Sequence, residues 1–360
     1  MCQEKSRKLT VEVFDGKEYI KIYRGDLLFD AEPNGLPLIL PCRYHQKAER
    51  IKVTALTNNY FHLSRVNVLV IKKKKKPINS KKIVFCRPRG GLNDMLVQMQ
   101  KCRIYALSHD RDLYIDGSKG GFLDSFSNYF IVPESVYFEG FEDFVRYNFS
   151  CYPACLENNM MNYQLTWLRE NGQHIHVLTN EPITFDFSRS YEEDILVHEQ
   201  GGSGFGIYAF EWLRLNEKVR VHIVRILEKL GEYDAIHVRN TDYKTDYKTF
   251  FKEIKDKLAG KIILCTDDLQ CQLYAKSFFG DKLCIVTELP DTKGKTLHSN
   301  RNIDRYNTNL NSLADLFILA NGKNLYFSTL FGKTKTSGFS KLAKSLHERQ
   351  DLVKKILHGE

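Results

Sequence analysis

The alternation of apolar strands and amphipathic helices in the second half of the chain limits the fold more than any other feature. Residues 233–238 form an apolar run that predicts a buried strand, and a helical pattern follows at 247–258. Strands that alternate with helices predict a parallel sheet, because parallel neighbours need a crossover segment between them. The further elements expected are strands at 261–265, 283–286 and 324–327 and helices at 269–279, 310–320 and 340–346.

A similar rhythm begins earlier, at residues 83–86, where a short apolar strand precedes a Gly-Gly turn. Apolar residues then recur at helical spacing, and residues 113–115 supply the next strand. The glycine-rich stretch Gly201–Gly206 predicts a flexible break, and an amphipathic helix follows it. We therefore expect an α/β protein with two Rossmann-like, doubly wound domains, at 83–210 and 211–360, with the boundary near 200–216.

The N-terminal part of the chain has a different pattern. Short strands are expected at 9–14, 19–23, 51–56 and 66–71, separated by turn residues. Residues 1–71 are therefore interpreted as a small β-rich accessory module, and residues 72–82 as a basic linker. A carbohydrate-binding role, an oligomerisation role and simple packing against the next domain all remain open for this module.

The charge of the chain indicates acidic partners. The 360 residues carry a formal net charge of +9, which favours phosphates, nucleotides, nucleic acid or an anionic membrane surface. Lysines cluster at Lys72–Lys76, which predicts a solvated linker or a patch that contacts the membrane peripherally. A nucleic-acid-binding protein that uses the basic region Lys72–Lys82 is the alternative hypothesis, but it needs exposed aromatics among the basic residues, whereas the doubly wound pattern favours a small-ligand crevice.

Cysteine spacing and hydropathy restrict the compartment and the cofactors. The nine cysteines are scattered, and the close pair Cys151 and Cys155 has no second pair to complete a zinc site. We expect reduced thiols, no structural metal and no cofactor. The N-terminus lacks an apolar signal core, and no run reaches the roughly 18 apolar residues of a spanning helix. A cytoplasmic protein, with the option of peripheral contact at the inner face of the membrane, is expected.

Polar clusters follow three of the C-terminal strands. They are His237–Asp242, Thr266–Asp268, and the hydroxyl-rich segments at 328–329 and 336–340. In open α/β sheets, ligands bind beyond the carboxyl ends of the strands, and an arginine there can hold a phosphate with two parallel hydrogen bonds. Free N–H groups at a helix start can also bind phosphate. Helix capping explains Asp268 or Ser337 equally well.

The first α/β half has a counterpart in the turn at Gly90, Gly91, Asn93 and Asp94, between a strand and a helix. Paired glycines allow a ligand to approach the backbone closely. The turn lacks the Gly-x-Gly-x-x-Gly spacing of dinucleotide-binding proteins. Asn93 and Asp94 can cap the helix or face a cleft.

The order of these motifs resembles the fucosyltransferase superfamily of GT-B glycosyltransferases, which includes α-1,2-, α-1,6- and protein O-fucosyltransferases. The resemblance rests on four motifs: the turn Gly90–Asn93, the His-x-Arg-x-x-Asp motif His237–Asp242, Thr266–Asp268, and Thr336–Ser340. Asn240 stands where these families usually have a second arginine, which leaves the sugar open. The resemblance covers roughly 83–347.

The resemblance implies a donor, GDP-fucose or another nucleotide-sugar, and an acceptor that is a glycan or a lipid-linked or other glycoconjugate of surface polysaccharide biosynthesis. Transfer would be inverting and independent of metal. Arg239 would neutralise the leaving β-phosphate, and Asp268 or Asp267 would contact the base or ribose. Asn93 and Asp94 would lie on the reaction side. The residues expected to bind the donor are Gly90, Gly91, His237, Asp242, Asp267, Asp268, Thr336, Ser337, Phe339 and Ser340.

An inverting transfer needs a general base for the acceptor hydroxyl. Asp94 is the candidate, and Glu199 and Asp242 are alternatives; Asp242 is also suited to orienting Arg239. His237, on a buried strand, is interpreted either as a satisfied core group or as an acid or base. A catalytically silent sugar-binding relative would carry the same motifs, so it is kept as a further hypothesis.

Overall fold

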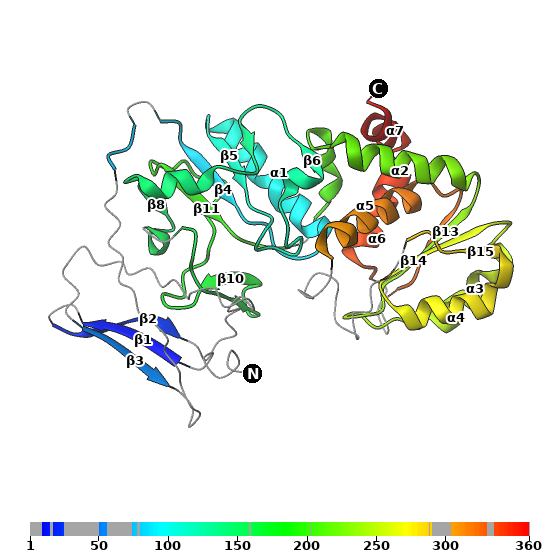
Figure 1. The fold of residues 1–360 in the computed structure, drawn as a ribbon, viewed down its shortest axis with the longest axis horizontal. Coiled ribbons are helices and arrows are strands. Elements are labelled where there is room, and N and C mark those ends of the chain that lie inside the picture. Colours follow the sequence, from blue (N-terminus) through cyan, green and yellow to red (C-terminus); the bar gives the residue numbers. More distant parts are fainter. Residues whose placement is uncertain are drawn as a thin grey trace. The chain divides into compact units, whose positions relative to one another are not determined.

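The chain packs into two compact units in a computed structural model that describes residues 9–14, 17–24, 50–55, 74–77, 80–157, 160–202, 204–287, 289, 304–329 and 335–359 (Figure 1). Unit 1 takes in Met1–Phe85, Ala106–Asp112 and Gly140–Gln200. Unit 2 takes in Cys86–Tyr105, Leu113–Glu139 and Gly201–Glu360. The domain boundaries expected from the sequence stay a prediction.

Unit 1 contains a three-stranded antiparallel sheet near the N-terminus. Its strands are β1 (Leu9–Phe14), β2 (Tyr19–Arg24) and β3 (Arg50–Ala55), in the order β2-β1-β3. Val11 and Val13 of the central strand are buried, as the alternation of side chains along a strand requires for one covered face. These three strands agree with the sequence expectation, whereas the strand expected at 66–71 lies outside the described residues.

Three further strands of unit 1 are neighbours in the order β4-β11-β8: β4 (Ile83–Cys86), β11 (Ile195–His198) and β8 (Cys151–Tyr152). β11 and β8 pair in parallel. Every residue of β4 and β11 is buried, which explains why both strands are nearly continuous apolar runs. An antiparallel hairpin joins β9 (Leu165–Leu168) to β10 (Gln173–His176).

Described lysines of the basic segment 72–82 have carboxylate partners within unit 1. The Nζ atom of Lys76 lies 2.7 Å from Asp194, and that of Lys82 lies 3.2 Å from Glu192. Lys81 pairs with Asp112 at 3.1 Å, which raises the pKa of its ammonium group. These lysines are thus partly neutralised by the protein itself.

Unit 2 is built on a four-stranded parallel sheet with the order β15-β14-β13-β16. The strands are β13 (Asp234–Val238), β14 (Ile262–Thr266), β15 (Leu283–Cys284) and β16 (Leu325–Phe327). This confirms the parallel sheet that the alternating pattern predicted. Only the first half of the strand expected at 283–286 forms.

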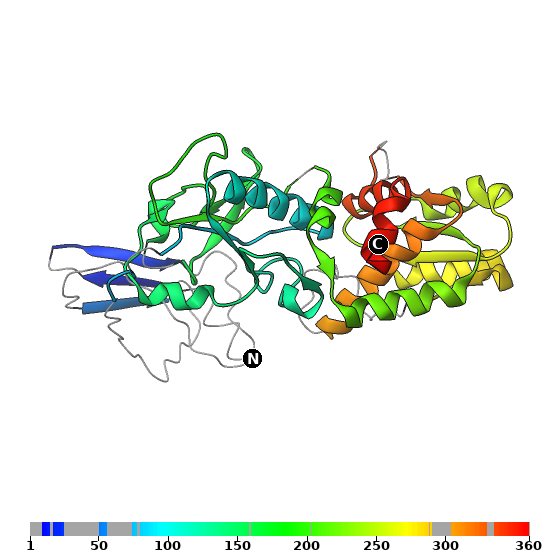
Figure 2. The same ribbon diagram turned by 90° about the horizontal axis from the view of Figure 1, so that it is seen from above.

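Helices cover both faces of this sheet (Figure 1, Figure 2). Ile236 and Val238 of β13 point to one face, where they pack against α3 (Tyr247–Ile254) and α4 (Leu269–Phe279). The alternate residue, His237, points to the other face and contacts α6 (Gly338–His347). α5 (Arg305–Asn321) packs on α6 and β13.

The remaining elements of unit 2 complete its layers. α1 (Leu92–Ser108) belongs to this unit up to Tyr105, and α2 (Glu217–Leu230) begins at an Asn216 cap. α7 (Gln350–His358) packs on α2, α5 and α6 and has no counterpart among the elements expected from the sequence. β5 (Asp112–Ile115) pairs in parallel with β7 (Val136–Tyr137), and β12 (Arg214–Leu215) pairs antiparallel with β6 (Phe130–Ile131).

Short 3₁₀ helices occupy several connections. They are η1 (Phe126–Asn128), η2 (Phe141–Arg146), η3 (Ala154–Leu156), η4 (Gly206–Glu211), η5 (Lys255–Lys257) and η6 (Gly280–Lys282).

The glycine-rich stretch Gly201–Gly206 differs from the flexible break that its composition predicted. A Cβ atom on Gly204 would lie 3.1 Å from Val97 of α1, and one on Gly206 would lie 2.8 Å from the Asn93 carbonyl oxygen. Side chains at these positions would collide with α1. The glycines therefore let this segment pack closely along the helix.

The described residues contain no group of three His, Cys, Asp or Glu side chains that could hold a metal ion. Cys151 and Cys155 are both buried. None of the described helices combines the length and the apolar composition needed to cross a bilayer.

Candidate active site

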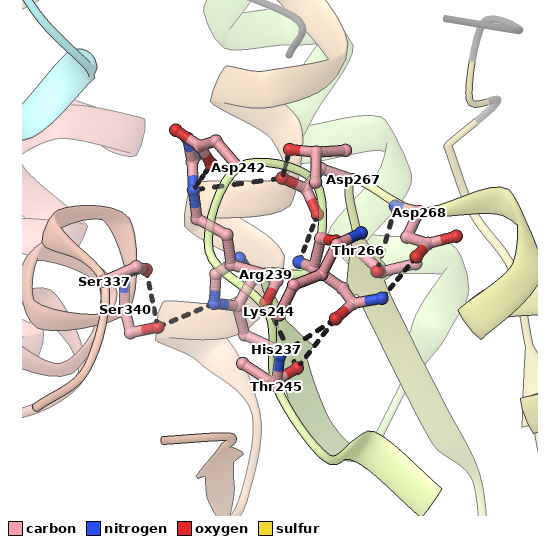
Figure 3. Close-up of polar contacts among 12 residues, drawn as sticks. His237, Arg239, Asp242, Lys244, Thr245, Thr266, Asp267, Asp268, Ser337 and Ser340 are labelled. Atoms are coloured by element: carbon pink, nitrogen blue, oxygen red, sulfur yellow. Dashed lines mark hydrogen bonds and ion pairs between the residues drawn. The ribbon is translucent and has the colours of Figure 1, made fainter. Parts of the chain in front are cut away.

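Three parallel strands of unit 2 bring the predicted polar clusters to one edge of the sheet. In the register of the sheet, Val238 pairs with Thr266 and His237 pairs with Phe327. The residues that follow β13, β14 and β16 therefore leave the sheet at the same end, where ligands of open α/β folds bind. Figure 3 shows Arg239, Asp267 and Asp268 gathered there, with Ser337 and Ser340 of α6 beside His237.

Arg239, the first residue after β13, is held by carboxylates. Its Nε and Nη2 atoms donate to Oδ1 of Asp242 at 2.9 and 2.7 Å, and Nε lies 3.9 Å from Asp267 (Figure 3). The side chain keeps 23% of its accessible surface. No other polar group within the described ranges contacts its Nη1 end, so the guanidinium is oriented and still has N–H groups for a ligand.

The loop after Arg239 is fixed by the two carboxylates that follow β14. Asp267 accepts hydrogen bonds from the Asn240 backbone at 2.7 Å and from the Thr241 hydroxyl at 2.6 Å. Asp268 accepts from the Asn240 amide and caps α4 through the N–H group of Gln270. The capping interpretation of Asp268 is therefore confirmed, while contact of either aspartate with a base or ribose stays a prediction.

Asn240, which stands where the resemblance expects a second arginine, stabilises the loop after β13 through hydrogen bonds. The residue is buried, and its Oδ1 atom accepts from the Thr245 backbone at 2.9 Å. Lys244 donates to the Asn240 carbonyl oxygen at 3.0 Å. An arginine could not make this set of bonds, because it has no acceptor atom.

His237 and α6 form a buried hydrogen-bonded chain. Nδ1 of His237 lies 2.7 Å from the Ser340 hydroxyl, which lies 2.9 Å from the Ser337 hydroxyl (Figure 3). Ser337 also caps α6, because its hydroxyl accepts from the Ser340 N–H group at 3.0 Å. Burial, together with the nearby Arg239 charge, lowers the pKa of His237 to about 3, so the imidazole is neutral near pH 7. The geometry favours a satisfied core group over an acid or base.

Asn93 and Asp94 begin α1 in the same unit. Gly90 has a φ of +95°, and a Cβ atom there would lie 2.9 Å from the Asp94 carboxylate. Burial raises the pKa of the Asp94 carboxyl, although the Asn93 side chain, the Gly91 N–H group and the charges of Arg239 and Lys341 oppose that shift. Asp94 is thus a partly desolvated carboxyl within the electrostatic reach of Arg239. Such a group is suited to accepting a proton near neutral pH.

The other predicted site residues have varied positions. The Phe339 ring lies 5.2 Å from the His237 ring, and Thr336 precedes the α6 cap as a half-buried residue. A Cβ atom on Gly91 would meet no atom within 4 Å, so this glycine leaves open space beside the turn. Glu199 belongs to unit 1, where it accepts a hydrogen bond from the Tyr163 hydroxyl.

Sequence reasoning missed a carboxyl at this end of the sheet. Asp315 of α5 accepts a hydrogen bond from the Thr287 hydroxyl at 2.7 Å, and its backbone carbonyl oxygen lies 4.0 Å from Sγ of Cys265 on β14. Burial raises the pKa of the Asp315 carboxyl to about 7. The signal that could have found it is an acidic residue inside an otherwise apolar helical stretch.

Comparison with known proteins identifies the fold. No protein-family profile and no curated protein sequence matches the chain. The crystal structure of the fucosyltransferase NodZ from Bradyrhizobium matches with a TM-score of 0.51 at 17% identity, over 74% of this chain and 93% of the other. NodZ alpha-1,6-fucosyltransferase co-crystallized with GDP gives a TM-score of 0.51 at 17% identity, with the same coverage of 74% and 93%. The crystal soaked with GDP-fucose gives a TM-score of 0.50 at 17% identity, again over 74% and 93%. The chain therefore has a fucosyltransferase-like glycosyltransferase fold, as the order of its motifs implied.

Proposed function

We propose that this protein is a glycosyltransferase that moves fucose from GDP-fucose to a hydroxyl group of a glycan or glycoconjugate, with inversion and without a metal ion. One observation carries the proposal: an arginine oriented by Asp242 lies at the ligand-binding edge of a fucosyltransferase-like fold, within electrostatic reach of the partly desolvated Asp94. The comparisons supply the fold and the donor of similar proteins.

The leaving group needs a cation. Transfer breaks the bond between C1 of the sugar and the β-phosphate oxygen, and negative charge builds on that oxygen. The open N–H groups of Arg239 and the N-terminus of α6 at Ser337 would stabilise this charge. The hydrogen bonds to Asp242 hold the guanidinium in place beforehand, so little reorganisation is needed when the bond breaks.

The acceptor needs a base. In the proposed step the acceptor oxygen attacks C1 while Asp94 takes the hydroxyl proton, and GDP leaves with the electron pair of the broken bond. The raised pKa of Asp94 brings its basicity closer to neutral pH. Glu199 and Asp242 fit this role less well, because Glu199 is bonded to Tyr163 and Asp242 to Arg239.

The wider setting belongs to the same proposal. The enzyme would act in the cytoplasm on a surface polysaccharide or lipid-linked glycan, and Asp267 or Asp268 would reach the base or ribose. Carboxylate partners at Lys76, Lys81 and Lys82 weaken the hypotheses of membrane contact and nucleic-acid binding, since these charges are already paired. The β-rich module at 1–71 and the GT-B arrangement of two domains remain proposals.

The test combines a donor screen with matched arginine variants. Thermal shifts with GDP, UDP, ADP, CMP and their sugars should single out GDP and GDP-fucose, because a ligand of the folded state raises stability by mass action. Arg239→Ala should lower the transfer rate by about 10²- to 10³-fold, the typical cost of losing one charge-stabilising donor. Arg146→Ala is the control, since Arg146 also pairs with an aspartate three positions away, Asp143, and lies outside the proposed site.

A second variant separates chemistry from binding. Asp94→Asn should keep the thermal shift with GDP and lose transfer. A donor screen without any response to GDP, or Arg239→Ala enzyme with transfer within a few-fold of wild type, would show that the proposal is wrong. Donor binding without turnover on any acceptor would instead support the catalytically silent relative.

A further inference from the structure

We propose that two exposed aromatic residues, Phe205 and Tyr208, form the acceptor platform, on which the apolar face of an acceptor sugar ring stacks. This inference rests on the proposed function and adds a binding site for the acceptor. Phe205 keeps 65% and Tyr208 52% of its accessible surface. Large rings left in water beside a candidate active site indicate a surface for a ligand.

Both aromatic residues lie at the start of η4, Tyr208 within the helix and Phe205 as its extended N-cap. Along Phe205–Glu211, exposed residues recur at every third position, while the four residues between them are buried. A 3₁₀ helix has three residues per turn, so side chains three positions apart lie above one another. Tyr208 and Glu211 therefore form an outward row on η4, and the exposed Phe205 directly precedes the helix.

The position of Phe205 is fixed by the buried side chain of Asn93. The Asn93 amide donates to the Gly204 carbonyl oxygen at 3.2 Å and accepts from the Gly206 N–H group at 3.1 Å. One amide thus holds the residues on both sides of Phe205. Asn93 is only 4% exposed, so these two hydrogen bonds are shielded from water, and they hold the backbone on either side of the exposed ring.

The same asparagine connects the acceptor platform to the proposed chemistry. Its side chain bonds to the Asp94 carboxylate and thereby opposes the rise in the pKa of Asp94. A Cβ atom on Gly338, at the start of α6, would lie 3.5 Å from Cβ of Asn93 and 3.8 Å from the Asp94 carboxylate. Asn93 therefore lies next to the proposed base, Asp94, and next to the start of α6. The same side chain also holds the backbone around Phe205.

The chemistry of these residues suits a sugar better than a lipid bilayer. A pyranose has an apolar face of C–H groups and a rim of hydroxyls. The rings match the face, because aromatic side chains combine a large apolar area with low conformational entropy cost. The row then ends in Glu211, which pairs with Arg349 at 3.3 Å and supplies charged groups for hydroxyls. A bilayer would need a wider apolar surface.

The test uses the full chain and a panel of neutral tetrasaccharides with different linkages. Saturation-transfer NMR should show the strongest transfer from protein to the ring C–H protons of at least one member, and Phe205→Ala/Tyr208→Ala should abolish it. In transfer assays with GDP-fucose, each single variant should raise the KM for that sugar about three- to tenfold, the range for one aromatic contact. Phe205→Tyr, which keeps an aromatic ring at this position, should have the wild-type KM.

Controls distinguish this site from the donor site. Both alanine variants should keep the thermal shift with GDP and the slow hydrolysis of GDP-fucose by water, and Leu273→Ala, at an exposed apolar residue of α4, should change nothing. If GDP does not bind, the proposed function fails while the NMR result still decides the sugar site. No saturation transfer to any panel member, an unchanged pattern in the double variant, or ring-dependent binding to anionic phospholipid vesicles would overturn the inference.

Discussion

Two arginines of unit 2 follow β-strands and pair with aspartates, but they differ in their access to solvent. Arg87 follows β4, donates to Asp116 at 2.8 Å and is only 1% exposed. Arg239 follows β13, donates to Asp242 at a similar 2.9 Å and keeps 23% of its surface. The two ion pairs have nearly equal lengths. They differ in burial, because the Arg87 side chain is enclosed whereas that of Arg239 is accessible to solvent.

The electrostatic consequences follow from that burial. The Asp116 carboxyl is itself largely enclosed, and burial alone would raise its pKa, yet the charge of Arg87 and bonds from Ser118 and Arg87 lower it. A charge removed from this enclosed pair would leave its partner unpaired in a medium of low polarity. Water and ligands can reach Arg239, so its pairing with Asp242 orients a charge that another anion can share.

The largest expected effect comes from breaking the enclosed pair. Arg87→Met should lower the free energy of unfolding by about 3–5 kcal/mol, because Asp116 would remain as an uncompensated buried charge. Denaturant titration followed by circular dichroism measures the change. The GDP affinity of the folded fraction should stay at the wild-type value.

A second substitution sharpens this expectation. Arg87→Met/Asp116→Asn removes both charges and should recover more than half of the lost stability, since the unpaired carboxylate is gone. A double variant as unstable as Arg87→Met would show that Arg87 acts through packing or its other contacts. Electrostatics would then not explain the difference between the Arg87–Asp116 pair and the Arg239–Asp242 pair.

Much of the frame around Arg239 could be predicted from the sequence. Strands buried on both faces are apolar throughout, so β13 and β14 stand out as short runs bounded by polar residues. α4 was expected at 269–279 and forms there, because Asp268 marks its start with a cap and Gly280 its end. The gathering of Arg239, Asp267 and Ser340 at one edge followed from parallel topology alone.

The contacts that fix the candidate site could not be predicted in this way. Asn93 brackets residues more than a hundred positions away, and no local pattern encodes such a contact. The glycines at 201–206 were expected as a flexible break, whereas their lack of side chains serves close packing on α1. Asp315 was missed for a related reason, since a helical pattern predicts burial but not which polar group is enclosed.

The next largest effect is the pH dependence of stability that arises from His237, the buried residue two positions before Arg239. The folded-state pKa of His237 is about 3, below the usual value near 6.5, so the unfolded chain binds a proton that the folded chain rejects. His237 thus favours folding fully above pH 6.5, and this stability is lost as the pH falls. Linkage gives a loss of about 2 kcal/mol between pH 7 and pH 5. His237→Asn, measured by urea unfolding at both values, should lack this part of the pH dependence; parallel curves would contradict it.

The smallest expected effect on stability comes from Asp242→Asn, which breaks the exposed Arg239–Asp242 pair. It compares this pair directly with the enclosed Arg87–Asp116 pair. Asp242→Asn should change the free energy of unfolding by less than about 1 kcal/mol, because both partners are partly exposed and water screens their attraction. Any effect should shrink at high salt. Unfolding of wild type and variant at low and high ionic strength measures both expectations. The loss should also stay below that of Asp116→Asn, the matched change at the enclosed pair. If instead Asp242→Asn costs as much as Arg87→Met and ignores salt, the pair is a structural element of the fold, and Arg239 is not available to hold a departing diphosphate.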